Sequence, residues 1–178
     1  MFAIVLAALD RSGSVLPILC AMAVHELAHV VMMLACGGQV RRLTLRFADL
    51  QIAASGLGYR QELLAALAGP LVNLICGAAF CMQRPSFAAY SLTLGIYNLL
   101  PVWPLDGGRM IRCVLLARLP ITQAEHISEI VSFAACAVLL LIGVFLTFFR
   151  KSGLWPLGTA AYLTVRLLML ARRTDTVQ

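Results

Sequence analysis

Charged residues are scarce in this chain. They make up 12% of its 178 residues, whereas 61% are hydrophobic, and the mean hydropathy is +0.91. A soluble domain carries roughly a quarter charged residues and about half apolar ones. The composition therefore excludes an ordinary soluble domain. It predicts an all-α, polytopic integral membrane protein that forms a single domain over residues 1–178.

Basic clusters with interleaved aromatic residues are also missing, so the net charge of +6 predicts no nucleic-acid partner. No two of the six cysteines have the C-x-x-C spacing, and five lie in or at the end of apolar runs. We interpret them as small buried residues, with a thiol metal site as the alternative. The opening MFAIVLAALD lacks a basic start and a cleavage site, which predicts no cleavable signal peptide.

Long apolar runs are what the chain does have. A spanning helix needs about 20 apolar residues. The runs predict about five transmembrane helices, over residues 14–36, 63–82, 87–103, 130–149 and 154–171. The first nine residues are apolar but too short to assign to a span or to an interfacial segment.

The basic residues between these runs predict the orientation. Ten of them fall on one side of the predicted membrane and four on the other. Because cytoplasmic loops carry the excess of Lys and Arg, we expect the N-terminus outside the cell and the C-terminus in the cytoplasm. The expected location is the plasma membrane.

The segment between the first two runs has a different periodicity. RLTLRF at 42–47 alternates polar and apolar residues, and Leu50 and Ile52 alternate in the opposite phase. This pattern predicts a small membrane-associated β-hairpin near residues 40–54. An amphipathic loop lying on the lipid headgroups is the alternative.

Histidine is rare as well: the chain has three, and two of them lie in VHELAHVV at residues 24–31. An ionisable residue at the bilayer centre costs about 3 kcal/mol on insertion scales, so this cluster needs compensating partners. His25 and His29 are spaced i, i+4 and share one helical face, where two imidazoles can bind one zinc ion. Glu26 can then act as general base toward a water molecule. The alternatives are polar contacts between helices, or a haem ligated by the histidines, which gives Glu26 no role.

A catalytic zinc ion usually takes a third protein ligand. Asp106 is the best candidate among the eight acidic residues, because Pro101 and Pro104 prevent a regular helix before it and two glycines follow it. Irregular backbone at membrane depth must be buried in protein or line a wet cavity. A surface turn in which Asp106 caps the following helix remains an equal alternative. His126 stands among polar residues, so we expect it to be solvated.

Three motifs together resemble a known family. HELAH at 25–29, AGPLVN at 68–73 and NLLPVWPLDGGR at 98–109 resemble, in this order, the site-2 protease family of intramembrane zinc metalloproteases. The last motif is most similar to the branch that contains the sporulation factor-processing proteases. The similarity covers about residues 14–120, which the resemblance implies to be the catalytic core.

The resemblance implies one Zn²⁺ per chain, held by His25, His29 and Asp106, with Glu26 as the catalytic base. Asn73 and Asn98 match polar positions of the other two motifs, where they would bind the substrate backbone or shape the site. Hydrogen bonds between packed helices are the alternative for both asparagines. Relative to the sporulation branch, we expect no full span before the HELAH helix, no nucleotide-sensing domain after the last span, and no inserted PDZ domain.

The expected function is that of an intramembrane endopeptidase. Its partners would be the lipid bilayer and a transmembrane or membrane-tethered protein substrate, from which it releases a cytosolic regulatory fragment. A transcription factor precursor or an anti-sigma factor is such a substrate; regulatory membrane partners are not identified. A zinc transporter is one rival, although it would need further polar residues along a pore. A non-catalytic protein that binds membrane helices is the other, and it gives Glu26 no role.

Overall fold

The computed structural model describes residues 13–46, 49–149 and 154–175. The first nine residues and Phe47, both considered above, lie outside these ranges. Most of the described chain is helical. Three of the described helices are long and apolar enough to cross a membrane: α2 (Val15–Ala35), α3 (Tyr59–Ala79) and α6 (Ile121–Phe148). A helix of 21 residues, the length of α2, extends about 31 Å, which matches a hydrocarbon core of about 30 Å.

The other two predicted spans coincide with α4 (Pro85–Asn98) and α7 (Trp155–Asp175). α4 has only 14 residues, since the proline-rich stretch after it ends the helix. α6 begins nine residues before the predicted run at 130–149, because its polar first turns are also helical. The structure thus supports a mostly helical membrane protein with three candidate spans, and five spans stay a prediction.

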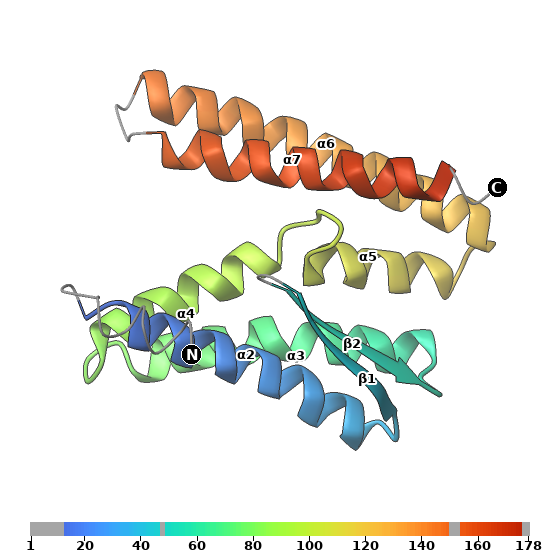
Figure 1. Cartoon of the computed structure of the whole chain (residues 1–178), viewed down its shortest axis with the longest axis horizontal. Helices are drawn as coiled ribbons and strands as arrows, with labels where there is room; N and C mark the ends of the chain where they lie inside the picture. The colour runs from blue at the N-terminus through green and yellow to red at the C-terminus, as the bar shows by residue number, and fades with distance from the viewer. Residues whose placement is uncertain (1–12, 47–48, 150–153, 176–178) are drawn as a thin grey trace. The chain divides into compact units, whose positions relative to one another are not determined.

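The chain forms two compact units, Met1–Leu99 and Leu100–Gln178, and the single domain stays a prediction. In the first unit, α2, α3 and α4 pack against one another (Figure 1). Small residues allow this packing, as is usual between membrane helices. A Cβ on Gly77 would lie 2.4 Å from Leu92 Cγ, and one on Gly95 would lie 3.1 Å from the carbonyl oxygen of Pro70. The backbones of α3 and α4 therefore approach closely.

A glycine ends α2. Gly37 has φ +80°, and the N–H groups of Gly37 and Gly38 donate to the carbonyls of Leu34 and Met33. This left-handed ending is the Schellman arrangement, which satisfies the last helical carbonyls. The Gln61 side chain then donates to the carbonyl of Cys36 at 3.1 Å and so joins the start of α3 to the end of α2.

Two antiparallel strands, β1 (Gln39–Arg46) and β2 (Asp49–Ser55), lie where the sequence predicted a hairpin near 40–54 (Figure 1). The register pairs Leu45 with Leu50 and Val40 with Ala54, with an irregularity between Val40 and Arg42. The strands follow directly from the end of α2 and lead into α3.

The second unit contains α5 (Asp106–Leu116), α6 and α7, and α6 and α7 lie side by side (Figure 1). The irregular stretch before α5 is held by α6. The backbone N–H of Trp103 donates to the Ser132 hydroxyl at 3.0 Å, and that hydroxyl donates to the carbonyl of Ser128 at 2.9 Å. Gly108 lets α5 fold back against the same stretch, since a Cβ there would lie 2.6 Å from the Trp103 nitrogen.

We predict that Ser132→Ala lowers the free energy of unfolding by about 1–3 kcal/mol, because it leaves the Trp103 N–H without its acceptor. The measurement is thermal unfolding of the purified protein in detergent. Ser91→Ala is the matched control: Ser91 is also fully buried, but its hydroxyl has no hydrogen-bond partner. Its removal should leave stability unchanged or raise it slightly. An equal loss for both variants would contradict the role of Ser132.

Candidate metal centre

The inward face of α2 carries the two histidines of the HELAH motif. The buried residues of this helix are four apart in sequence: Ala21, His25, His29 and Met33. Large apolar residues such as Leu27 and Val31 are instead more than half exposed, at 61% and 56%. In a membrane helix this is the expected inversion, because lipid accepts the apolar side chains and polar ones must find partners inside the protein.

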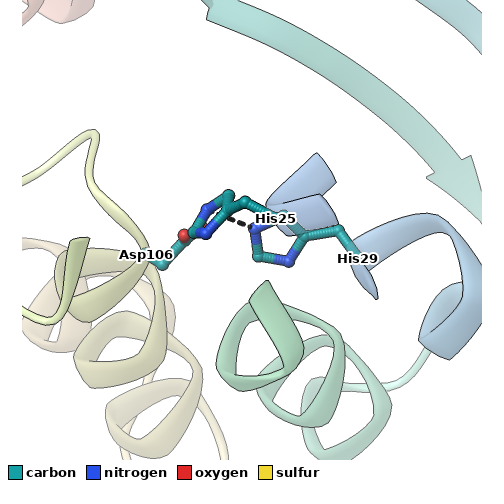
Figure 2. A group of neighbouring side chains, drawn as sticks. All are labelled: His25, His29 and Asp106. Atoms are coloured by element: carbon teal, nitrogen blue, oxygen red, sulfur yellow. Dashed lines mark hydrogen bonds between the residues drawn. The ribbon is translucent and has the colours of Figure 1, made fainter. Parts of the chain in front are cut away.

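The two imidazoles contact each other through the same ring nitrogen. Nε2 of His25 lies 3.1 Å from Nε2 of His29, and the rings meet edge to face with centroids 4.6 Å apart (Figure 2). Nδ1 of His29 lies 2.7 Å from the carbonyl oxygen of Ala65, which can only accept a hydrogen bond. His29 therefore donates from Nδ1, so a neutral His29 presents the lone pair of Nε2 on the side that faces His25.

One face of α3 supports the pair. Ala65, Gly69 and Asn73 are spaced four residues apart, and all three are buried. The Ala65 carbonyl accepts from His29, and the Asn73 amide nitrogen lies 3.2 Å from Nδ1 of His25.

Gly69 lies between these two contacts and leaves room for both rings. A Cβ at this position would lie 2.4 Å from Nε2 of His29 and 2.9 Å from Cε1 of His25. Real Cβ atoms do not approach other heavy atoms so closely. The sequence analysis quoted Gly69 within a motif but gave it no role.

Asp106 is the first residue of α5 and is 7% exposed. Its Oδ1 lies 3.5 Å from Nη1 of Arg109, one helical turn later, and Arg109 is partly exposed. The pair neutralises the carboxylate charge within its own unit and restricts its rotation. Gly108 and the preceding irregular stretch fix where α5 begins, which places Asp106 at the N-terminus of the helix.

Three buried side chains carry atoms that a metal ion can bind: His25 and His29 in the first unit, and Asp106 in the second. Two imidazole nitrogens and one carboxylate oxygen are ligands that zinc accepts. The donor set therefore fits a zinc ion chemically.

The remaining residues that the sequence analysis considered for the site differ in burial and in their contacts. Glu26 is half-buried next to His25. The Asn98 amide donates to the Leu94 carbonyl of its own helix at 3.0 Å, so the structure gives Asn98 a local contact. His126 is exposed on α6. Of the six cysteines only Cys113 and Cys136 are buried, so the interpretation of all six as buried residues is wrong for the other four.

Comparisons with known proteins agree with these motifs. The model of peptidase family M50 matches residues 82–142, which include NLLPVWPLDGG. Stage IV sporulation protein FB of Bacillus subtilis is 28% identical over 138 residues, or 70% of this chain and 47% of that protein. Zinc metalloprotease MJ0392 of Methanocaldococcus jannaschii is 25% identical over 133 residues, or 67% and 39%. The chain thus spans less than half the length of these curated relatives.

A solved structure has the same fold. The site-2 protease from Methanocaldococcus jannaschii superposes with a TM-score of 0.68 at 19% identity, covering 94% of this chain and 83% of that one. The chain is thus similar in sequence to Stage IV sporulation protein FB and to a zinc metalloprotease, and in fold to a site-2 protease. This confirms the resemblance found in the motifs, including its similarity to a sporulation protein.

We predict that Gly69→Ala displaces both imidazoles and weakens metal binding by more than about tenfold, the scale on which misplaced supporting groups act. The measurement is Zn²⁺ affinity of the purified protein, by competition with a chromophoric chelator. Gly158→Ala is the control, because a Cβ at this helical position meets nothing within 4 Å. Unchanged affinity in Gly69→Ala would mean that the close approach of α3 does not hold the rings.

Proposed function

We propose that this protein is an intramembrane zinc endopeptidase. One observation carries the proposal: two buried imidazoles on one face of α2 present Nε2 atoms 3.1 Å apart. The names of the relatives, one a zinc metalloprotease and one a site-2 protease, support the same chemistry. His25, His29 and Asp106 would hold one zinc ion per chain.

A zinc ion at this place supplies a Lewis acid that polarises a peptide carbonyl and lowers the pKa of water. The protein's own residues do the rest. Glu26 is the only acidic residue in the HELAH helix, and it follows His25 directly. Its carboxylate takes the proton of the attacking water and gives it to the nitrogen of the leaving amine. The surrounding apolar helices limit the access of bulk water.

The substrate class follows from the location of the site. Buried residues of a membrane helix can act on a transmembrane or membrane-tethered protein. A helical substrate must unwind locally before water can attack its amides, and the pair β1–β2 offers a strand edge to which an extended segment can add. The released part would be a cytosolic regulatory fragment. A zinc transporter or a non-catalytic helix-binding protein would not need a base at Glu26.

The proposed topology has five spans in the plasma membrane, with the N-terminus outside and the C-terminus in the cytoplasm. Three described helices meet the length and hydropathy of a span. α4 and α7 would supply the other two. The asymmetry of ten basic residues against four supports the orientation.

We predict that Glu26→Gln reduces cleavage of a membrane-anchored reporter by about 10²–10⁴-fold, because glutamine cannot accept the water proton. The zinc content should not change, since the three proposed ligands remain. His29→Ala should lose both zinc and activity. The measurements are gel-based cleavage after co-expression and metal analysis of the purified variants.

The contrast between the two variants tests the rivals. A transporter reconstituted in liposomes would carry zinc equally well with Glu26→Gln. Cleavage by Glu26→Gln at the wild-type rate would show that Glu26 is not the base, and full zinc content in His29→Ala would remove that ligand from the centre.

We also predict that reporter fusions after Arg60, Arg84, Arg118 and Lys151 read cytoplasmic, external, cytoplasmic and external. The reason is the excess of basic residues on the side that carries Arg60 and Arg118. The inverse order would reverse the topology, and equal readings after Arg84 and Arg118 would exclude the α4 span.

A further inference from the structure

The contact between Asn73 and His25 is not part of the proposed reaction. Asn73 is 0% exposed at the centre of α3, and its Nδ2 lies 3.2 Å from Nδ1 of His25. Its Oδ1 is also buried and has no hydrogen-bond partner. Buried polar atoms are normally paired, so an orphaned amide oxygen directly beside a proposed ligand calls for an explanation.

We propose that Asn73 is a positioning residue for the zinc centre. Its amide oxygen accepts a hydrogen bond from the Nδ1–H of His25 and so fixes the form of the imidazole that binds zinc through Nε2. This inference rests on the proposed zinc site, and it gives a specific contact and purpose to a residue that the resemblance assigned either to substrate binding or to shaping the site.

The chemistry of imidazole requires such an acceptor. A neutral imidazole has one N–H, so a ring that binds a metal through Nε2 carries its proton on Nδ1 and must donate from there. His29 meets this requirement with the Ala65 carbonyl at 2.7 Å. The corresponding atom of His25 faces the Asn73 amide. The partners of the two histidines, Ala65 and Asn73, thus lie on the same face of α3, each one helical turn from Gly69.

The amide can present either of its ends to the ring. A half-turn about the Cβ–Cγ bond exchanges Nδ2 and Oδ1 at nearly the same positions. With nitrogen toward the ring, the amide donates to Nδ1 and the oxygen stays unpaired. With oxygen toward the ring, the amide accepts from Nδ1–H, and the orphaned atom gains its partner. The second orientation is the one that ligation by Nε2 selects.

Burial favours this role over contact with a substrate. A side chain that is 0% exposed cannot reach a peptide backbone without a rearrangement of α3. Asn98 differs, because its amide donates to its own helix and it is partly exposed. Asn98 is therefore a suitable control for Asn73, because Asn73 contacts an imidazole whereas Asn98 bonds to its own helix.

The experiment measures Zn²⁺ affinity of the full chain in detergent by competition with a chromophoric chelator. Asn73→Leu keeps the volume but removes the acceptor, and we expect a 10–100-fold loss of affinity, the usual effect of removing the partner of a metal-bound histidine. Asn73→Asp keeps an acceptor in the form of a carboxylate and should bind zinc as tightly as the wild type or more tightly. Asn98→Leu should bind as the wild type does. Absorption of the Co²⁺-loaded forms reports whether the tetrahedral geometry is kept, and thermal unfolding reports folding.

Each outcome has a distinct meaning. Wild-type affinity in Asn73→Leu would overturn the positioning role. An equal loss in Asn73→Leu and Asn73→Asp would also overturn it, because Asn73 would then act through packing or through its N–H₂ group. Either result leaves the zinc centre and the protease proposal standing. A wild-type protein that binds no zinc would overturn the centre itself, and the positioning role with it.

Discussion

The pairing of polar atoms inside an apolar helix bundle is the constraint on which this structure depends. Hydrocarbon offers no hydrogen bonds, so burying an imidazole or amide inside the bundle is costly unless the protein supplies a partner. α2 turns His25 and His29 inward and leaves Leu27 and Val31 exposed. The partners come from α3, and they are available only because Gly69 lets the backbone of α3 approach the rings. The same face of α3 therefore provides both the close packing against α2 and the hydrogen-bond partners of the two imidazoles.

The candidate ligands could be predicted from the sequence, but the residues of α3 that hold the two imidazoles in place could not. The i, i+4 spacing of His25 and His29 places both on one face of a helix whatever the rest of the fold. Asp106 stood out because prolines before it and glycines after it interrupt the helix. Ala65 and Gly69 carry no polar side chain, and their roles depend on contacts with residues about 40 positions away in the chain. Such contacts cannot be derived from a single sequence, although the four-residue spacing of Ala65, Gly69 and Asn73 was visible in it.

The limits of the fold prediction have similar causes. Hydropathy alone placed the start of the last charge-free run at residue 130, whereas α6 begins at Ile121, because polar residues can continue a helix beyond its apolar part. The predicted run at 87–103 corresponds to a helix that ends at Asn98, since the prolines beyond it cannot extend a helix. Apolar length therefore predicts where helices lie, but it predicts their ends poorly where a polar helical segment or a proline adjoins the apolar run.

The two histidines are held by partners of different kinds, and this difference has a consequence. His29 donates to a backbone carbonyl, which no side-chain substitution at Ala65 removes. His25 depends on an asparagine side chain, which a single substitution removes and which can turn either end toward the ring. The main chain thus fixes one ligand permanently, while the other ligand is set by a group that can both donate and accept. A substitution that removes a hydrogen-bond partner of the imidazoles should therefore act on His25, whereas Gly69→Ala acts on both rings by steric contact.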